Sequence, residues 1–151
     1  MSVLSFGSSA ATGQPNPPHP GQQAVLQWVI ARLRHPPLTG LNVLYVQHGV
    51  RSGGTRAVLH AALYRVLQEP GIRWLCGRKD FADLRLSIWE TLREILPAPC
   101  FLESNTQEHR YVLRSTIVGS SSTLFLRELK DVHGLGSQEF GLITVHEAHE
   151  I

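Results

Sequence analysis

The sequence predicts an α/β fold in which a mainly parallel β-sheet has flanking helices and includes a β-hairpin. Two short apolar runs, 42–46 and 72–76, are rich in β-branched and aromatic residues, and each precedes a segment with helical spacing of apolar residues. Two β-type runs, 110–114 and 123–126, flank a Gly-Ser stretch, as in a hairpin, and a last apolar run covers 142–145. The alternation of strands and helices indicates parallel strands joined by crossover connections.

Composition narrows the class of protein. The chain has 151 residues, of which 42% are hydrophobic and 17% charged, so it can build one domain with a core. The net charge of +2 does not by itself indicate nucleic-acid binding. No apolar run approaches the roughly 18 residues of a membrane-spanning helix. Two distant cysteines make neither a disulfide scaffold nor a zinc ribbon, and residues 1–11 lack the pattern of a secretory signal, so we expect a cytoplasmic protein.

The N-terminal region predicts a leader followed by a helix. Residues 1–20 contain no charged side chain and are rich in Ser, Gly and Pro, which predicts a flexible leader, with the folded domain covering 21–151. Apolar residues at helical spacing begin after Gly21, and Pro36-Pro37 ends that helix.

The middle of the chain predicts two further helices. The first follows a glycine-rich turn and ends at Pro70-Gly71. The second follows the strand at 72–76, begins near Asp80 as a plausible N-cap, and ends at Pro97.

The glycine-rich turn at 48–55 has the length of a phosphate-binding loop. Such a loop follows the pattern G-x-x-x-x-G-K-[ST] between a strand and a helix, and its backbone N–H groups surround phosphate oxygens. Here His48 stands at the first glycine, Gly53 at the second, Gly54 at the lysine and Thr55 at the last position. A glycine-rich turn that binds no ligand is the alternative.

The last strand leads directly into polar residues. An apolar strand followed by His146 and Glu147 is similar to a Walker B segment, in which an acidic residue holds the Mg²⁺ shell and the next positions the attacking water. One alternative is a metal site formed by His146, Glu147, His149 and Glu150, whose spacing does not match the zinc-protease motif. Another is a strand end with solvated polar residues.

Four segments in order resemble the ATPase part of the large terminase subunit of tailed bacteriophages. They are VLYVQHGVRSGGTR at 43–56, GIRWLCGRKDFADLR at 71–85, EHRYVLRSTIVGSSSTLFLREL at 108–129 and GSQEFGLITVHEAHEI at 136–151. The resemblance implies a P-loop NTPase-like sheet that is incomplete at the C-terminus, because the chain stops after Walker B.

The same resemblance implies a nucleotide site. Glu147 takes the catalytic position, and Thr55 and His146 the Mg²⁺ positions. Gln22 and Gln23 sit where the family has an adenine-contacting glutamine. The residues implied in nucleotide binding are Gln22, Gln23, His48, Gly49, Arg51, Ser52, Gly53, Gly54, Thr55, Arg56 and Arg78.

Two departures from the family pattern concern charge. Gly54 replaces the phosphate-binding lysine and His146 replaces the metal-side acid, although Arg51 lies within the loop and could reach a phosphate. We therefore expect ATP and Mg²⁺ as cofactors with weak binding and little or no hydrolysis, and whether the chain is an enzyme stays open.

The family further implies viral DNA, a portal, a small terminase subunit and a homo-oligomeric ring as partners, in the bacterial host cell. We expect the chain alone to bind DNA weakly and to bind no membrane. Three hypotheses remain: a terminase motor module, as a fragment or a decayed copy; a non-catalytic remnant or interaction domain that keeps the P-loop fold; and another P-loop ATPase, such as a helicase-like domain. A helicase would need further motifs after Walker B.

Overall fold

The computed structural model describes residues 19–34, 53–130 and 138–147. The predicted leader up to residue 18, the strand at 42–46 and most of the glycine-rich turn lie outside these ranges. The chain divides into two compact units, 1–65 and 66–151, which are considered separately.

The first unit contains helix α1 (Pro20–Arg34) and most of helix α2 (Gly54–Gln68). The predicted first helix is confirmed and begins at Pro20, one residue earlier than expected, because proline suits the first position of a helix. The N–H of Gly21 donates to Nδ1 of His19 at 3.2 Å, which satisfies one of the free donors at this end. Along α2, the buried apolar side chains include those of Ala57, Leu59, Ala61, Ala62 and Leu63.

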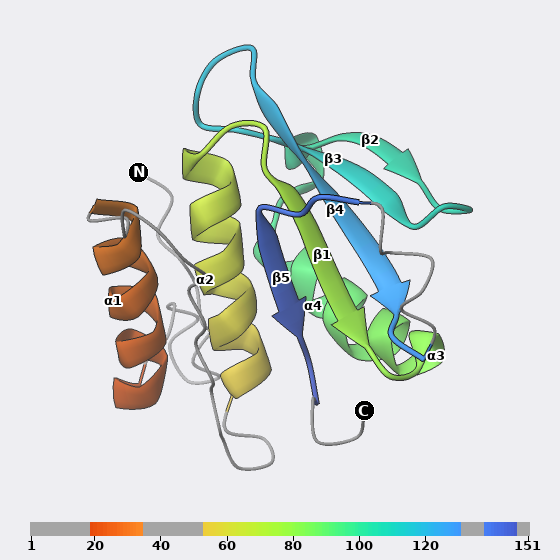
Figure 1. Cartoon of the computed structure of the whole chain (residues 1–151), viewed down its shortest axis with the longest axis horizontal. Coiled ribbons are helices and arrows are strands. Elements are labelled where there is room, and N and C mark those ends of the chain that lie inside the picture. The colour runs from red at the N-terminus through yellow and green to blue at the C-terminus, as the bar shows by residue number, and fades with distance from the viewer. Residues whose placement is uncertain (1–18, 35–52, 131–137, 148–151) are drawn as a thin grey trace, which may run out of the picture. The chain divides into compact units, whose positions relative to one another are not determined.

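The second unit contains a five-stranded sheet (Figure 1). Its strands are β1 (Arg73–Arg78), β2 (Phe101–Asn105), β3 (Arg110–Arg114), β4 (Ser121–Glu128) and β5 (Leu142–Val145). The strand order is β2-β3-β4-β1-β5, and β1 runs parallel to both β4 and β5. The antiparallel pairing of β3 with β4 confirms the predicted hairpin, and the α/β class is confirmed with it.

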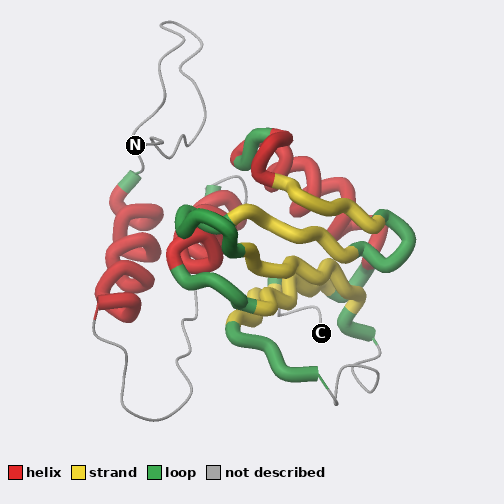
Figure 2. Tube along the Cα trace, turned by 90° about the horizontal axis from the view of Figure 1, so that it is seen from above, coloured by secondary structure: helices red, strands yellow, loops and turns green. Residues whose placement is uncertain are grey.

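A helical segment covers one face of this sheet (Figure 2). It consists of α3 (Phe81–Asp83), the π-helical η1 (Leu84–Trp89) and α4 (Glu90–Ile95), followed by the short 3-10 turn η2 (Ala98–Cys100). The sequence predicted one regular helix here. Ser87 and Thr91 each donate a hydroxyl hydrogen bond of 2.6 Å to the carbonyl four residues back, and such bonds compete with the backbone pattern of a regular α-helix.

Burial alternates along the strands, because successive side chains point to opposite faces. On β4, Ser122, Leu124 and Leu126 are buried and the residues between them are only partly so. Cross-strand pairing places Leu124 beside the fully buried Trp74. Trp89 of η1 stacks on Tyr111 of β3 with ring centroids 4.1 Å apart, so the helical segment packs on this face.

Strand β2 is an element that the sequence did not predict. Its central residues are exposed, so it carries no apolar alternation. The turn that follows is organised by Asn105, whose Oδ1 accepts hydrogen bonds from the N–H groups of Gln107 and Glu108 at 3.1 and 3.0 Å. This asparagine turn is the signal that could have located the strand.

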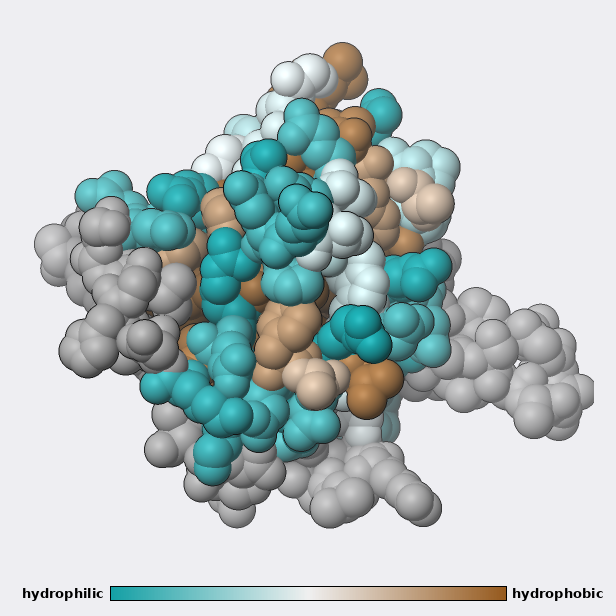
Figure 3. Space-filling model, turned by 90° about the vertical axis from the view of Figure 1, so that its right-hand side faces the viewer, coloured by the Kyte–Doolittle hydropathy of each residue, from teal (hydrophilic) through white to brown (hydrophobic). Residues whose placement is uncertain are grey.

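The surface seen in Figure 3 is largely hydrophilic, with apolar side chains in separate patches. Large exposed apolar residues among those described are Leu86, Leu102, Ile117, Val118, Ile143 and Val145. None of the helices in the described ranges has the length and apolar character needed to cross a membrane.

Candidate functional site

The carboxyl ends of β4, β1 and β5 meet at one edge of the sheet, because these three strands are parallel. In open α/β sheets this edge is where ligands bind. Charged and polar side chains follow each strand here: Arg78 to Asp80 after β1, Glu128 and Lys130 at β4, and His146 and Glu147 after β5. The structure therefore gathers at one edge several residues that the sequence places far apart.

Arg78 is the centre of this cluster. Its Nη2 forms an ion pair with Glu147 and lies 3.8 Å from a carboxylate oxygen of Asp83. Its Nη1 donates to Oγ of Ser87 at 3.0 Å. The arginine side chain is 14% exposed, and among the described residues none accepts a hydrogen bond from its buried Nε. The guanidinium is thus held in place from two elements of the second unit, η1 and the end of β5.

His146 and Glu147 differ in their surroundings although they are neighbours. The N–H of His146 donates to the carbonyl of Gly77 at 2.9 Å, which extends the pairing of β5 with β1, and His146 is buried. Glu147 has a φ of 56°, a left-handed conformation that non-glycine residues seldom adopt. This turn of the backbone accompanies the contact between the Glu147 carboxylate and Arg78.

A second ion-pair group lies at the end of β4. Lys130 contacts Asp80 and has its Nζ 3.1 Å from a carboxylate oxygen of Glu128. The hydrogen bond from Lys130 lowers the pKa of Asp80, and the bonds to Asp80 and Glu128 raise the pKa of Lys130. Asp80 stands at the N-cap position of α3 as predicted, but its side chain makes no capping hydrogen bond because it is bound to Lys130.

In the first unit, the described part of the glycine-rich turn is Gly53, Gly54 and Thr55. Gly53 has a φ of 74°, which favours glycine, and Gly54 begins α2. The side-chain amide of Gln22 donates to the carbonyl of Gly53 at 3.3 Å and accepts from the N–H of His19 at 3.0 Å. Gln22 thereby connects α1 to the turn.

The remaining predicted site residues are divided between regions. Gln23 is exposed, and Thr55 and Arg56 are half-buried on the first turn of α2. His48, Gly49, Arg51 and Ser52 lie outside the described residues, as do His149 and Glu150 of the alternative metal site. In the described part of the chain, no group of three or more His, Cys, Asp or Glu side chains gathers closely enough to hold a metal ion.

Sequence reasoning missed the residues that surround Arg78. Asp83 and Ser87 were expected only as polar positions of a helix, and Lys130 was given no role. The signal that could have found them is position: each lies just beyond the carboxyl end of a parallel strand, where chains from several elements converge.

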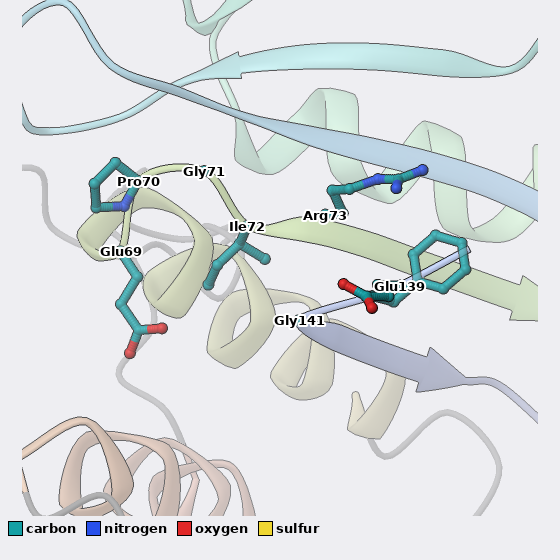
Figure 4. A pocket seen from close by; sticks show the side chains of 8 residues that line it. Glu69, Pro70, Gly71, Ile72, Arg73, Glu139 and Gly141 are labelled. Carbon is teal, nitrogen blue, oxygen red and sulfur yellow. The ribbon is translucent and has the colours of Figure 1, made fainter. Parts of the chain in front are cut away.

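A shallow pocket of about 420 Å³ lies at the opposite, amino end of the sheet (Figure 4). Arg73 at the start of β1 and Glu139 before β5 line it. The Arg73 guanidinium lies over the rings of Phe125 and Phe140, 5.2 and 5.5 Å from their centroids, and donates to Gln138 at 3.2 Å. These contacts already hold the arginine, so the carboxyl edge is the better candidate site.

Three solved structures resemble this chain, all of the large terminase from one thermophilic bacteriophage. One in crystal form 3 has a TM-score of 0.70 at 14% identity and matches 89% of this chain and 32% of its own. One in complex with ADP has a TM-score of 0.73 at 12% identity, with 89% and 33% covered. One in crystal form 2 has a TM-score of 0.61 at 16% identity, with 77% and 28% covered.

The likeness establishes a terminase-like fold. The chain spans about a third of the length of the terminase chains in crystal form 3. No protein-family model matches the sequence, and no curated protein matches it.

Proposed function

We propose that this chain is a nucleotide-binding module of the terminase motor type, with weak nucleotide binding and little or no hydrolysis. The observation that carries the proposal is the likeness to the thermophilic phage's large terminase over 89% of this chain, in a structure that contains ADP. The four segments that resemble the terminase family fall within or beside the elements of this fold. The sequence pattern and the fold therefore support the same function.

In this proposal the turn at 48–55 receives the phosphates. Gly53 supplies the left-handed residue before the helix, and the first N–H groups of α2 offer donors to an anion. Gln22 stabilises the turn through its bond to Gly53.

Position 146 does not fit Mg²⁺. This hard cation prefers oxygen ligands, and His146 offers an imidazole that is buried at the end of β5. Gly54 likewise offers no charge where the family has lysine. Both departures support weak binding rather than efficient turnover, and no catalytic step is assigned to a metal here.

The test is to restore both groups with the double variant Gly54→Lys/His146→Asp. Each restored charge-assisted contact is typically worth about 1.5–3 kcal/mol. If the two contributions add, Mg-ATP affinity or turnover rises roughly hundredfold to ten-thousandfold. Isothermal titration and phosphate release measure the two quantities on the full chain.

A charge-matched control is Ser104→Asp/Thr106→Lys, which adds the same charged side chains at exposed positions of the second unit. It should leave binding and turnover as in the unaltered chain. No gain in the restored variant would count against a phosphate site in the turn. Appreciable turnover without restoration would show that another group, such as Arg51, replaces the lysine.

A non-catalytic interaction domain is the second candidate function. It is favoured by the ion pair that occupies Glu147, the residue proposed as catalytic, together with Gly54 and His146. For either function we propose that DNA binding by the chain alone is weak and salt-sensitive, because 14 basic residues face 12 acidic ones.

A further inference from the structure

We propose that Arg78 is a phosphate-binding group and that the Glu147 carboxylate occupies it while no ligand is bound. A phosphate group must then displace Glu147 from Arg78 in order to bind. The link to nucleotides rests on the function proposed above, whereas the exchange of anions on Arg78 rests on the geometry of the carboxyl edge alone.

Arg78 is suited to this role by the way it is held. Its position at the end of β1 fixes the backbone, and the hydrogen bond from Nη1 to Ser87 fixes one arm of the guanidinium. The other arm carries Glu147, and the buried Nε donates to none of the described residues. A guanidinium that is already oriented loses little freedom when it binds a phosphate, and its planar fork matches phosphate oxygens.

Glu147 is suited to being displaced. Its side chain is 39% exposed, so a solute can reach the contact. Its φ of 56° is strained for a residue with a Cβ, and such conformations persist only where the surroundings enforce them. Loss of the ion pair would allow the backbone at Glu147 to relax. Asp83, at 3.8 Å on the other side of Arg78, remains to balance part of the charge.

The exchange has a consequence for regulation. While Glu147 binds Arg78, its carboxylate is not free to act on another group. Arrival of a phosphate at Arg78 would release this carboxylate. Ligand binding and release of the acid would thus be one event at the same guanidinium.

The experiment uses inorganic pyrophosphate without Mg²⁺ as the probe, titrated into the full chain. The unaltered chain is compared with Arg78→Gln, Arg78→Lys, Glu147→Gln and the control Glu90→Gln. Glu90 pairs with Arg93 on an exposed helix surface at 3.8 Å, so its loss changes net charge equally without affecting Arg78.

We expect Glu147→Gln to bind pyrophosphate about fivefold more tightly, the change expected for loss of one competing, partly exposed ion pair. Arg78→Gln should abolish this binding and Arg78→Lys should keep part of it. A merely structural ion pair gives no gain on loss of Glu147. No gain, or an equal gain in Glu90→Gln, would overturn the inference even if Arg78→Gln fails to fold.

A parallel titration with ADP separates this inference from the proposed function. Pyrophosphate binding that follows the expected order, without ADP binding by any variant, would remove the nucleotide function and leave the anion exchange intact. ADP binding that is equal in all of these proteins, with pyrophosphate insensitive to Arg78, would do the reverse.

Discussion

At the scale of single residues, Gly77 permits the closest approach in the sheet. A Cβ at this position would lie 2.6 to 2.7 Å from three side-chain carbons of Leu129, which is itself buried. We predict that Gly77→Ala lowers the free energy of unfolding by about 1–3 kcal/mol, because the buried leucine must shift within a packed region. Urea unfolding followed by circular dichroism measures the change.

Gly141 provides the matched control for this substitution. An added Cβ there would meet only Ile72, at 3.7 and 3.8 Å, which is ordinary contact. Gly141→Ala should therefore be neutral or slightly stabilising, since alanine reduces the freedom of the unfolded chain. Equal effects of the two substitutions would show that the approach of Leu129 does not constrain position 77.

At the scale of elements, Ser122 of β4 joins three segments of the second unit. Its Oγ accepts from the N–H of Ile72 at 3.1 Å and lies within donating distance of the carbonyls of Val66 and Glu69, at 3.2 and 3.3 Å. The hydroxyl thus connects the last turn of α2, the start of β1 and β4. The serine was read from the sequence only as part of a hairpin turn.

We predict that Ser122→Ala destabilises the protein by about 1–3 kcal/mol, because it leaves the buried N–H of Ile72 without its acceptor. Ser120→Ala is the control, since its hydroxyl bonds to the carbonyl of Ile117 in an exposed turn. Unfolding midpoints in urea report both variants. A loss in Ser120→Ala as large as that in Ser122→Ala would contradict the argument.

The elements also show what the sequence could predict and why. The strands at 72–76, 110–114, 123–126 and 142–145 were predicted because burial selects apolar side chains locally. Strand β2 has exposed central residues and is held by pairing with β3, so no local pattern marks it. The contact between Arg78 and Glu147 joins residues that are 69 positions apart, and only the parallel register of β1 and β5 brings them together.

The site was predictable to a lesser degree than the fold. Glu147 and Arg78 were both identified, but for binding a nucleotide rather than each other. A motif specifies the residue types that a ligand needs, whereas the partners of a charge in the ligand-free chain depend on packing. The position of Gln22 beside Gly53 follows the implied proximity of that glutamine to the turn, and its contact with adenine stays a prediction.

At the scale of the whole molecule, Cys76 reports on the opening of the sheet. It lies fully buried on β1, and burial raises the pKa of its thiol from 9.0 to about 12, opposed only in part by a hydrogen bond with Thr144. Because the thiolate is disfavoured in the folded state, the unfolded chain releases this proton at lower pH. The contribution of Cys76 to stability is therefore complete below pH 9.0 and is lost as the pH rises towards about 12.

We predict that the free energy of unfolding falls with pH in this window by up to about 1.4 kcal/mol per pH unit more in the unaltered chain than in Cys76→Ala. Other alkaline titrations, including that of Tyr111, whose pKa burial also raises, are common to both proteins and cancel in the difference. Guanidinium unfolding at a series of pH values from roughly 8 to 11 gives the two slopes, with roughly half-unit steps sufficient for a difference of this size. The less buried cysteine offers the control, Cys100→Ala, which should keep the slope of the unaltered chain. Parallel slopes for Cys76→Ala and the unaltered chain would mean that Cys76 reaches solvent without unfolding of the sheet, because a thiol that ionises equally in both states contributes no dependence on pH.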